Sequence, residues 1–178
     1  MKIVTLSGSL RAASSNGALL RAVGAVAPDG VEVLHFTGLG GLPHFNPDLD
    51  APDLAPPPTV AEFRALLASA DGFVVSTPEY VHGLPGAFKN ALDWIVSSGE
   101  FSKKPVLIIN ASSSGGQFAQ AALVEILSTM EARVLADATV VAPRARREMT
   151  KSGEIADAAV LNAIKIGVQA LISALSAQ

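Results

Sequence analysis

Short apolar segments alternate with helical patterns along the whole chain of 178 residues. We predict strands at the apolar and partly β-branched ranges 3–6, 31–36, 73–75, 105–110 and 134–141. Between them, apolar residues recur every three or four positions and predict helices through Leu19 and Val26 that stop near Pro28 to Gly30, over 59–70, from Pro85 towards Gly99, over 118–130, and through Leu161 and Leu175. This alternation predicts an α/β protein with one parallel sheet covered by helices on both faces. Right-handed crossovers leave the five-stranded doubly wound order 2-1-3-4-5 as the simplest topology, and the length favours a single domain over residues 1–178.

The range 38–58 is predicted to be a loop, because prolines recur through it and forbid regular structure. A loop of this length inside a domain is usually functional or mobile. Thr59 and Glu62 form a capping-box pattern, which predicts the start of the next helix. Asp48, Asp50 and Asp53 lack the spacing of a calcium loop, so we interpret them as solvated side chains.

Three predicted strand-to-helix turns, over 8–16, 78–83 and 111–116, are rich in glycine, serine or other small residues. Thr77 is pushed towards extended geometry by Pro78 and ends its strand, while Pro85 suits the first position of the following helix. The turns follow the first, third and fourth strands, whose carboxyl ends lie side by side in this topology. The sequence therefore predicts a ligand site at this edge of the sheet.

The first turn has the donors that a phosphate monoester needs. Hydroxyl, amide and guanidinium groups are supplied by Ser9, Arg11, Ser14, Ser15 and Asn16. The start of the following helix adds a partial positive charge. Serine and asparagine are also common helix caps, so a well-capped helix without a ligand stays an alternative.

Composition and missing motifs exclude several classes of function. The net charge of -3 argues against nucleic acid as a partner, and the absence of cysteine excludes disulfides and thiolate metal sites. Neither a P-loop nor a G-x-G-x-x-G turn after the first strand is present, and no serine shows a hydrolase partnership. The amino terminus turns polar at residues 7–9, and no apolar run reaches the roughly 18 residues of a membrane span, so we expect a cytoplasmic protein without a membrane partner.

Two of these turns carry motifs of a known family. Gly8-Ser9-Leu10-Arg11 with Ser14 and Asn16 resembles the FMN phosphate loop of the NADPH-dependent FMN reductases, the flavodoxin-like group that includes quinone, chromate and azo reductases. The residues at 77–80, 85–86, 89–91 and 93–94 are similar to the second signature of that family, and 42–46 with Asp48 fits its variable loop. The resemblance covers about the first 135 residues.

The resemblance implies a flavodoxin-like three-layer sandwich, tightly bound FMN, NADPH or NADH as electron donor, and a homodimer or homotetramer with the flavin near the interface. Carried over position by position, it implies phosphate contacts at Ser9, Arg11, Ser14 and Asn16. It implies contacts along one edge of the flavin ring, largely through backbone amides, at Pro78, Glu79, Tyr80, Val81, His82 and Gly83. It implies support on the other side of the ring from Ser112, Ser113, Gly115 and Gly116. Val81 and His82-Gly83 depart from the family, which usually has asparagine and then an aromatic or polar residue followed by serine.

We therefore expect an FMN-dependent oxidoreductase that passes hydride from NAD(P)H through flavin N5 to a small acceptor such as a quinone, an azo compound, chromate or free flavin. The flavin carries the chemistry, so no catalytic side chain and no metal are expected. Two alternatives stay open: a non-catalytic flavin-binding or electron-carrier module, and a structural domain without a ligand.

A few other side chains carry a functional and a plain interpretation. His82 is either a general acid or an exposed loop histidine. Arg144, Arg146 and Arg147 either bind the 2′-phosphate of NADPH, pair across a subunit contact, or form a solvated turn. We expect Trp94 to serve packing, and Lys89 to pair with Asp93 four residues later.

Overall fold

The computed structural model describes residues 1–111, 116–142, 149–150 and 153–177. Its strands are β1 (Lys2–Ser7), β2 (Glu32–Phe36), β3 (Gly72–Ser76), β4 (Pro105–Asn110), β5 (Arg133–Val134) and β6 (Val140–Val141). Its α-helices are α1 (Ser15–Val26), α2 (Pro58–Ala68), α3 (Gly86–Asp93), α4 (Gln117–Thr129) and α5 (Ala158–Ser176). Short 3₁₀ turns are η1 (Leu39–Gly41), η2 (Pro47–Leu49) and η3 (Ala136–Ala138).

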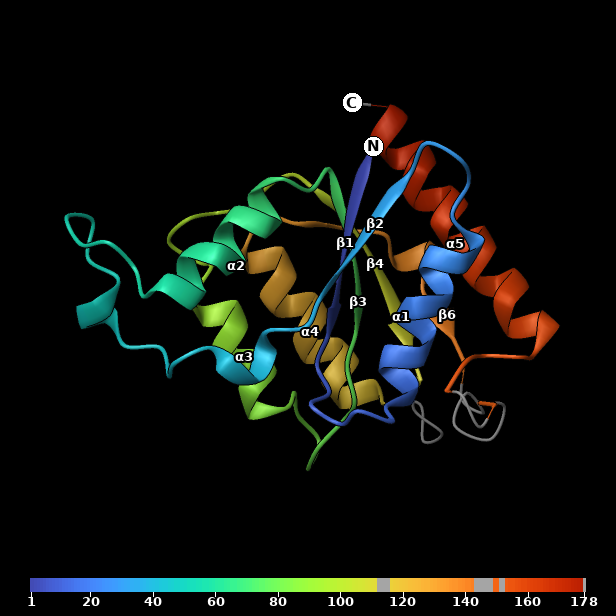
Figure 1. The fold of residues 1–178 in the computed structure, drawn as a ribbon, viewed down its shortest axis with the longest axis horizontal. Helices are drawn as coiled ribbons and strands as arrows, with labels where there is room; N and C mark the ends of the chain where they lie inside the picture. Colours follow the sequence, from blue (N-terminus) through green and yellow to red (C-terminus); the bar gives the residue numbers. More distant parts are fainter. Residues whose placement is uncertain (112–115, 143–148, 151–152, 178) are drawn as a thin grey trace.

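The strands form one parallel sheet in the order β2-β1-β3-β4-β5, with β6 also paired to β4. This confirms the predicted fold class and strand order. Figure 1 labels β1 to β4 and β6 of this sheet. The prediction of one fifth strand over 134–141 is wrong, because η3 interrupts that range and divides it between β5 and β6. The two short strands lie beside opposite ends of β4, with Arg133 opposite Pro105 and Val140 opposite Ile109.

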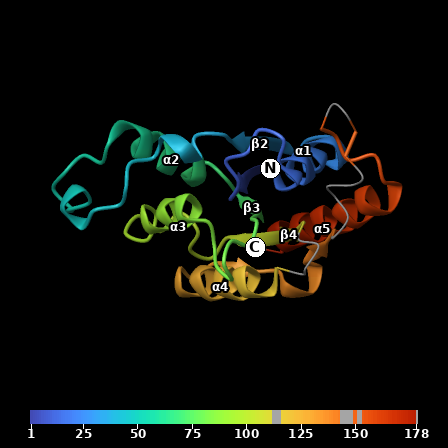
Figure 2. The same cartoon turned by 90° about the horizontal axis from the view of Figure 1, so that it is seen from below.

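Helices cover both faces of the sheet, and each face has its own core. Figure 2 shows α1 and α5 on one side of the strands and α2 and α3 on the other. Leu19 and Ile164 belong to the core under α1 and α5, whereas Phe63, Phe88 and Leu123 belong to the core under α2, α3 and α4. Strands β3 and β4 are buried along their whole length, which explains their uninterrupted apolar sequences.

The helices begin close to the predicted positions, with one difference in mechanism. Helix α2 starts at Pro58, and no side chain caps it, so the predicted capping box of Thr59 and Glu62 does not form. Proline fixes the helical φ value at the first position, and the carbonyl oxygen of Pro57 accepts from the amides of Val60 and Ala61. Pro85 lies one position earlier than predicted, as the residue that precedes α3.

Within the described part of the chain, one helix is long and apolar enough to match a membrane-spanning segment, and it is α5. Ile164, Val168 and Leu171 of this helix are buried in the core shared with α1 and β4. Core helices of globular proteins meet the same criterion of length and composition.

The segment between β2 and α2 extends away from the sheet, at the left of Figure 1. We call residues 42–57 the arm. The predicted loop over 38–58 is wrong in three places: η1 lies just before the arm, η2 lies within it, and α2 already begins at Pro58. Leu49 and Leu54 are exposed on it.

Candidate functional site

The turns after β1 and β3 lie together at the carboxyl end of the sheet, at the lower end of Figure 1. The amide of Gly8 donates to the carbonyl oxygen of Ser76 at 2.9 Å. A Cβ atom at Gly8 would lie 2.2 Å from Oγ1 of Thr77 and 3.2 Å from the Phe88 ring. Only glycine fits this position, because the Gly8 backbone lies directly against the Thr77 side chain of the second turn.

Helix α1 begins at the first turn with two free backbone donors. The buried Ser14 hydroxyl accepts from the amide of Gly17 and caps the helix. The amides of Ser15 and Asn16 have no hydrogen-bond partner among the described residues. The cap is therefore incomplete, and it leaves a pair of N–H groups at the positive end of the helix.

The Asn16 side chain provides a third free donor. It is 5% exposed, and its Oδ1 accepts from the Ser76 hydroxyl at 2.9 Å. Its Nδ2 has no partner in the described parts of the chain. A buried amide nitrogen without an acceptor costs about 1–3 kcal/mol, which an anionic ligand would recover. The site thus fits a phosphate group by an observation that does not depend on the sequence motif.

Two further residues of the first turn are placed consistently with this site. Arg11 is exposed, and its guanidinium makes no ion pair within the described residues. The Ser9 hydroxyl accepts from the Arg11 amide at 3.4 Å. The exposed Leu10 lies between them, and a Cβ atom at Gly40 would lie 3.3 Å from its Cδ2, so η1 flanks the turn.

The second turn forms a two-residue hairpin. Tyr80 and Gly83 exchange both backbone hydrogen bonds at 3.0 Å. Val81 and His82 occupy the two central positions with φ values of 49° and 58°. This is the type I′ geometry, in which both central residues are left-handed. We call residues 80–83 the hairpin. Val81 is fully exposed.

Two contacts join the hairpin to helix α4. The Glu79 carboxylate accepts from the amides of Phe118 and Ala119, each at 2.9 Å. The His82 ring stacks on the Phe118 ring, with centroids 4.1 Å apart and planes 25° apart. Gly116, left-handed at φ 54°, precedes α4 and supplies no side-chain cap, so Glu79 caps this helix from another loop.

Comparison with known proteins identifies the family. Residues 1–147 match the family described as NADPH-dependent FMN reductase. The chain is 33% identical over 175 residues to an NAD(P)H-dependent FMN reductase of Pseudomonas aeruginosa, which covers 96% of this chain and 93% of the relative. The chain belongs to the NADPH-dependent FMN reductase family. It is therefore an oxidoreductase that uses FMN and NAD(P)H, as the resemblance implied.

Other relatives agree with this assignment. The reductase is 35% identical over 139 residues to a quinone reductase of Escherichia coli, covering 76% of this chain and 73% of that protein. Among solved structures, it is similar to the flavoenzyme NAD(P)H:(acceptor) oxidoreductase FerB of Paracoccus denitrificans, with a TM-score of 0.85 and 25% identity. That similarity covers 99% of this chain and 97% of FerB.

Some predicted site residues lie outside the part that the structure describes. These are Ser112, Ser113 and Gly115 of the third turn, and Arg144, Arg146 and Arg147. Gly116 is described and buried at the start of α4. No group of three histidine or acidic side chains that could hold a metal occurs within the described residues.

The second signature of the reductase has a structural part that its sequence does not reveal. Nδ2 of Asn90 donates to the carbonyl oxygen of Pro43 at 2.9 Å, and its Oδ1 accepts from the amide of Phe45 at 2.7 Å. Nε1 of Trp94 donates to the same Pro43 oxygen at 2.8 Å, and its ring contacts Phe45 edge-on. Asn90 and Trp94 therefore hold the start of the arm. The prediction that Trp94 serves packing is confirmed, because it is fully buried.

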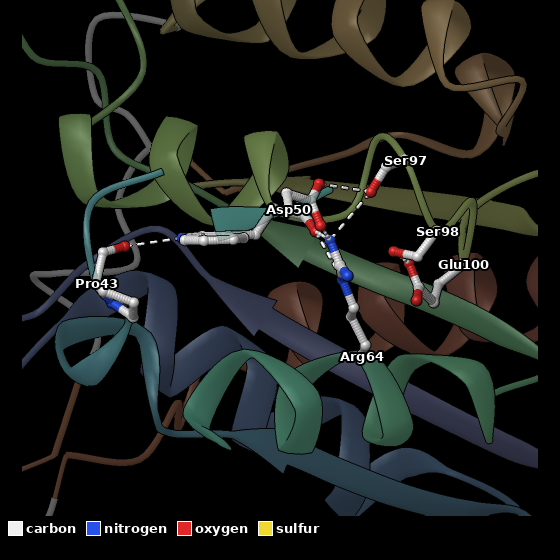
Figure 3. Close-up of polar contacts among 7 residues, drawn as sticks. Pro43, Asp50, Arg64, Ser97, Ser98 and Glu100 are labelled. Atoms are coloured by element: carbon white, nitrogen blue, oxygen red, sulfur yellow. Dashed lines mark hydrogen bonds and ion pairs between the residues drawn. The ribbon is translucent and has the colours of Figure 1, made fainter. Parts of the chain in front are cut away.

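The middle of the arm is held by an ion pair (Figure 3). Asp50 accepts from Arg64 at 2.7 Å and from the Ser97 hydroxyl at 2.7 Å, and its side chain is only 9% exposed. The expectation that Asp50 is solvated is therefore wrong. Burial raises the pKa of Asp50, but hydrogen bonds from Ser97 and Arg64 and the charge of Arg64 outweigh it and bring the pKa below its usual value. Lys89 pairs with Asp93 at 2.5 Å, as predicted.

A cavity of about 220 Å³ lies between α1 and β2, beside the first turn. His35 lines it, and its Nδ1 lies 2.6 Å from the Thr5 hydroxyl. Burial and the nearby charge of Arg21 lower the pKa of His35, which favours the neutral ring. Sequence reasoning did not single out His35, because a lone histidine on a strand carries no pattern.

Proposed function

We propose that the reductase holds FMN across the turns after β1, β3 and β4 and delivers electrons from NAD(P)H to a quinone. The main support for the site is a group of donors at the first turn that have no partner within the described ranges, namely the amides of Ser15 and Asn16 and the buried Nδ2 of Asn16. Three donors around a helix start match the oxygens of a phosphate monoester. Ser9, Arg11 and Ser14 would complete the phosphate contacts.

The hairpin would bind one edge of the flavin ring. The amides of Val81 and His82 have no partner among the described residues and lie on an exposed turn. Pro78, Tyr80 and Gly83 would line the same edge. The Glu79 carboxylate is occupied by α4, so we assign its contact with the ring to its backbone. Ser112, Ser113, Gly115 and Gly116 stay the proposed support on the opposite side.

When bound, FMN supplies the hydride transfer between NAD(P)H and the acceptor. The protein binds, orients and shields the ring, and none of its side chains needs to donate or remove a proton. A planar quinone is the proposed acceptor because relatives at 35% identity are named quinone reductases. The exposed Tyr80 and Val81 beside the proposed ring position offer apolar surface to such a molecule.

We further propose that residues 1–178 form a single flavodoxin-like domain that works as a cytoplasmic homodimer or homotetramer without nucleic acid or membrane partners. A cytoplasmic location gives direct access to NAD(P)H. The apolar Leu49 and Leu54 on the extended arm are suited to a contact between subunits.

A flavin titration of the purified protein tests the proposal. We expect the fluorescence of added FMN to be quenched in a saturable way, and NAD(P)H to bleach the absorbance of bound flavin. Addition of a benzoquinone should restore the absorbance and give steady turnover. Riboflavin, which lacks the phosphate, is the matched control ligand and should bind much more weakly.

Two outcomes would contradict the proposal in different ways. FMN binding without turnover on any NAD(P)H and quinone pair would support the alternative of a non-catalytic flavin module. Equal affinity for riboflavin and FMN would show that the donors of the first turn do not hold the phosphate.

A further inference from the structure

The hairpin has a backbone conformation that its own sequence disfavours. Left-handed geometry costs an ordinary L-residue about 1–2 kcal/mol, and a β-branched residue there is an outlier. Val81 is β-branched, has a φ of 49°, and gains nothing from packing because its side chain is fully exposed. A conformation of this kind persists only where surrounding contacts impose it.

The surrounding contacts come from the first turn of α4. The Glu79 carboxylate, next to the hairpin, binds the amides of Phe118 and Ala119. The His82 ring, at the second central position, lies flat on the Phe118 ring. Phe118 is 46% exposed and is not a core residue, and its ring stacks on His82. One residue of α4 thus takes part in both attachments, through its amide and through its ring.

We propose that Phe118 is a positioning residue for the flavin site, and that it acts through His82. By holding the His82 ring, Phe118 keeps both central residues of the hairpin left-handed, so that their amides, which have no partner among the described residues, stay on the exposed turn. This role rests on the proposed function, in which those amides bind the edge of the flavin ring. Phe118 itself needs no contact with the flavin.

The role predicts a preference between redox states. Reduced flavin carries more negative charge on its ring than oxidised flavin, so backbone N–H donors stabilise the reduced form more strongly. Loss of the hairpin geometry should therefore weaken the binding of reduced FMN more than that of oxidised FMN. The midpoint potential of the bound flavin should become more negative. A general loss of stability would weaken both forms alike and leave the potential unchanged.

The central experiment compares Phe118→Ala with Phe118→Tyr, which keeps the ring. Amide hydrogen exchange at Val81 and His82 is measured in flavin-free protein, followed by the dissociation constants for oxidised and reduced FMN. Phe118→Ala should speed exchange at both amides and raise the dissociation constant for reduced FMN by roughly 2- to 12-fold, the factor that one aromatic pair contributes. Phe118→Tyr should behave like the unaltered protein. Ile166→Ala removes an exposed apolar side chain from α5 and is the matched control.

A double-variant cycle tests whether the effect runs through His82. If it does, the double variant His82→Ala with Phe118→Ala should bind reduced FMN as tightly as either single variant, because the two rings act as one unit. Additive effects would overturn the proposal, as would unchanged exchange at Val81 and His82 in Phe118→Ala. If the midpoint potential of the bound flavin stays constant while the dissociation constants for oxidised and reduced FMN rise equally, Phe118 has only a structural role and the proposal is wrong. Failure of the unaltered protein to bind FMN would instead refute the proposed function, and the exchange result would still stand by itself.

Discussion

Replacing Val81 should make the reductase more stable, although valine is an ordinary residue on a surface. The left-handed conformation at Val81 costs about 1–2 kcal/mol, and the exposed side chain returns no burial energy. Asparagine tolerates this conformation far better. We therefore expect Val81→Asn to raise the free energy of unfolding by about 0.5–1.5 kcal/mol. Val81→Gly should gain less, because glycine loses about 0.5–1 kcal/mol through its greater freedom in the unfolded chain.

The free energy of unfolding is measured by urea unfolding of flavin-free protein, so that changes in cofactor binding do not contribute. Calorimetry is the second measurement: for a protein of this size, 1 kcal/mol shifts the midpoint of thermal unfolding by roughly 2–4 °C. Val96→Asn is the matched control, because Val96 is also exposed, at 62%, but does not have a positive φ. The control should be neutral or slightly destabilising. If both asparagine variants change stability equally, or if Val81→Asn destabilises, the strain at the hairpin is not as we describe it.

Three further predictions concern the phosphate site and the arm. Arg11→Ala should weaken FMN binding by about 1.5–3 kcal/mol while leaving the affinity for riboflavin unchanged; equal loss for both ligands would contradict a phosphate contact. Asn90→Ala should lower the free energy of unfolding by about 1–3 kcal/mol, because the Phe45 amide loses its acceptor and the Pro43 carbonyl oxygen keeps only the donor on Trp94; Lys89→Ala, which removes a surface pair on the same helix, is the control and should cost less than about 0.5 kcal/mol. The folded-state pKa of Asp50 lies below its unfolded value, so its ion pair with Arg64 stabilises the fold above the unfolded pKa, and that contribution disappears as the pH falls below about 4 through the folded pKa. Across this pH window, the free energy of unfolding should fall more steeply with falling pH for the unaltered protein than for Asp50→Asn. Equal slopes for the two proteins would refute the assignment.

Local patterns were enough to predict the sheet and most of the helices. The strand order follows from strand and helix alternation together with the handedness of crossovers, and the continuous apolar run at 105–110 became β4 with the same bounds. The prediction of one strand over 134–141 was wrong because the apolar residues in that range do not show where strand pairing stops. Strand pairing depends on the partner β4. Residues 133–134 pair with β4 near one end, and residues 140–141 pair with it near the other end.

The turns after β1 and β3 follow their strands as predicted, but their internal contacts were not predicted. The motifs located the turns, since glycine and hydroxyl residues after strands form a local signal. That Glu79 caps a helix almost 40 positions away is a tertiary fact without a sequence pattern. The same holds for Asp50, whose partner Arg64 lies on α2. A positive φ at Val81 was not foreseen, because β-branched residues rarely adopt it and the hairpin is imposed by its neighbours.

The contact between Gly8 and Thr77 has a consequence for redesign. Since no side chain of any size can be inserted there, the loops that would receive the two ends of the cofactor cannot be adjusted independently. A library that aims to broaden the range of accepted oxidants should leave this junction untouched. Diversity is better introduced at the outward-facing tip, where Val81 shows that even an ill-suited residue is tolerated.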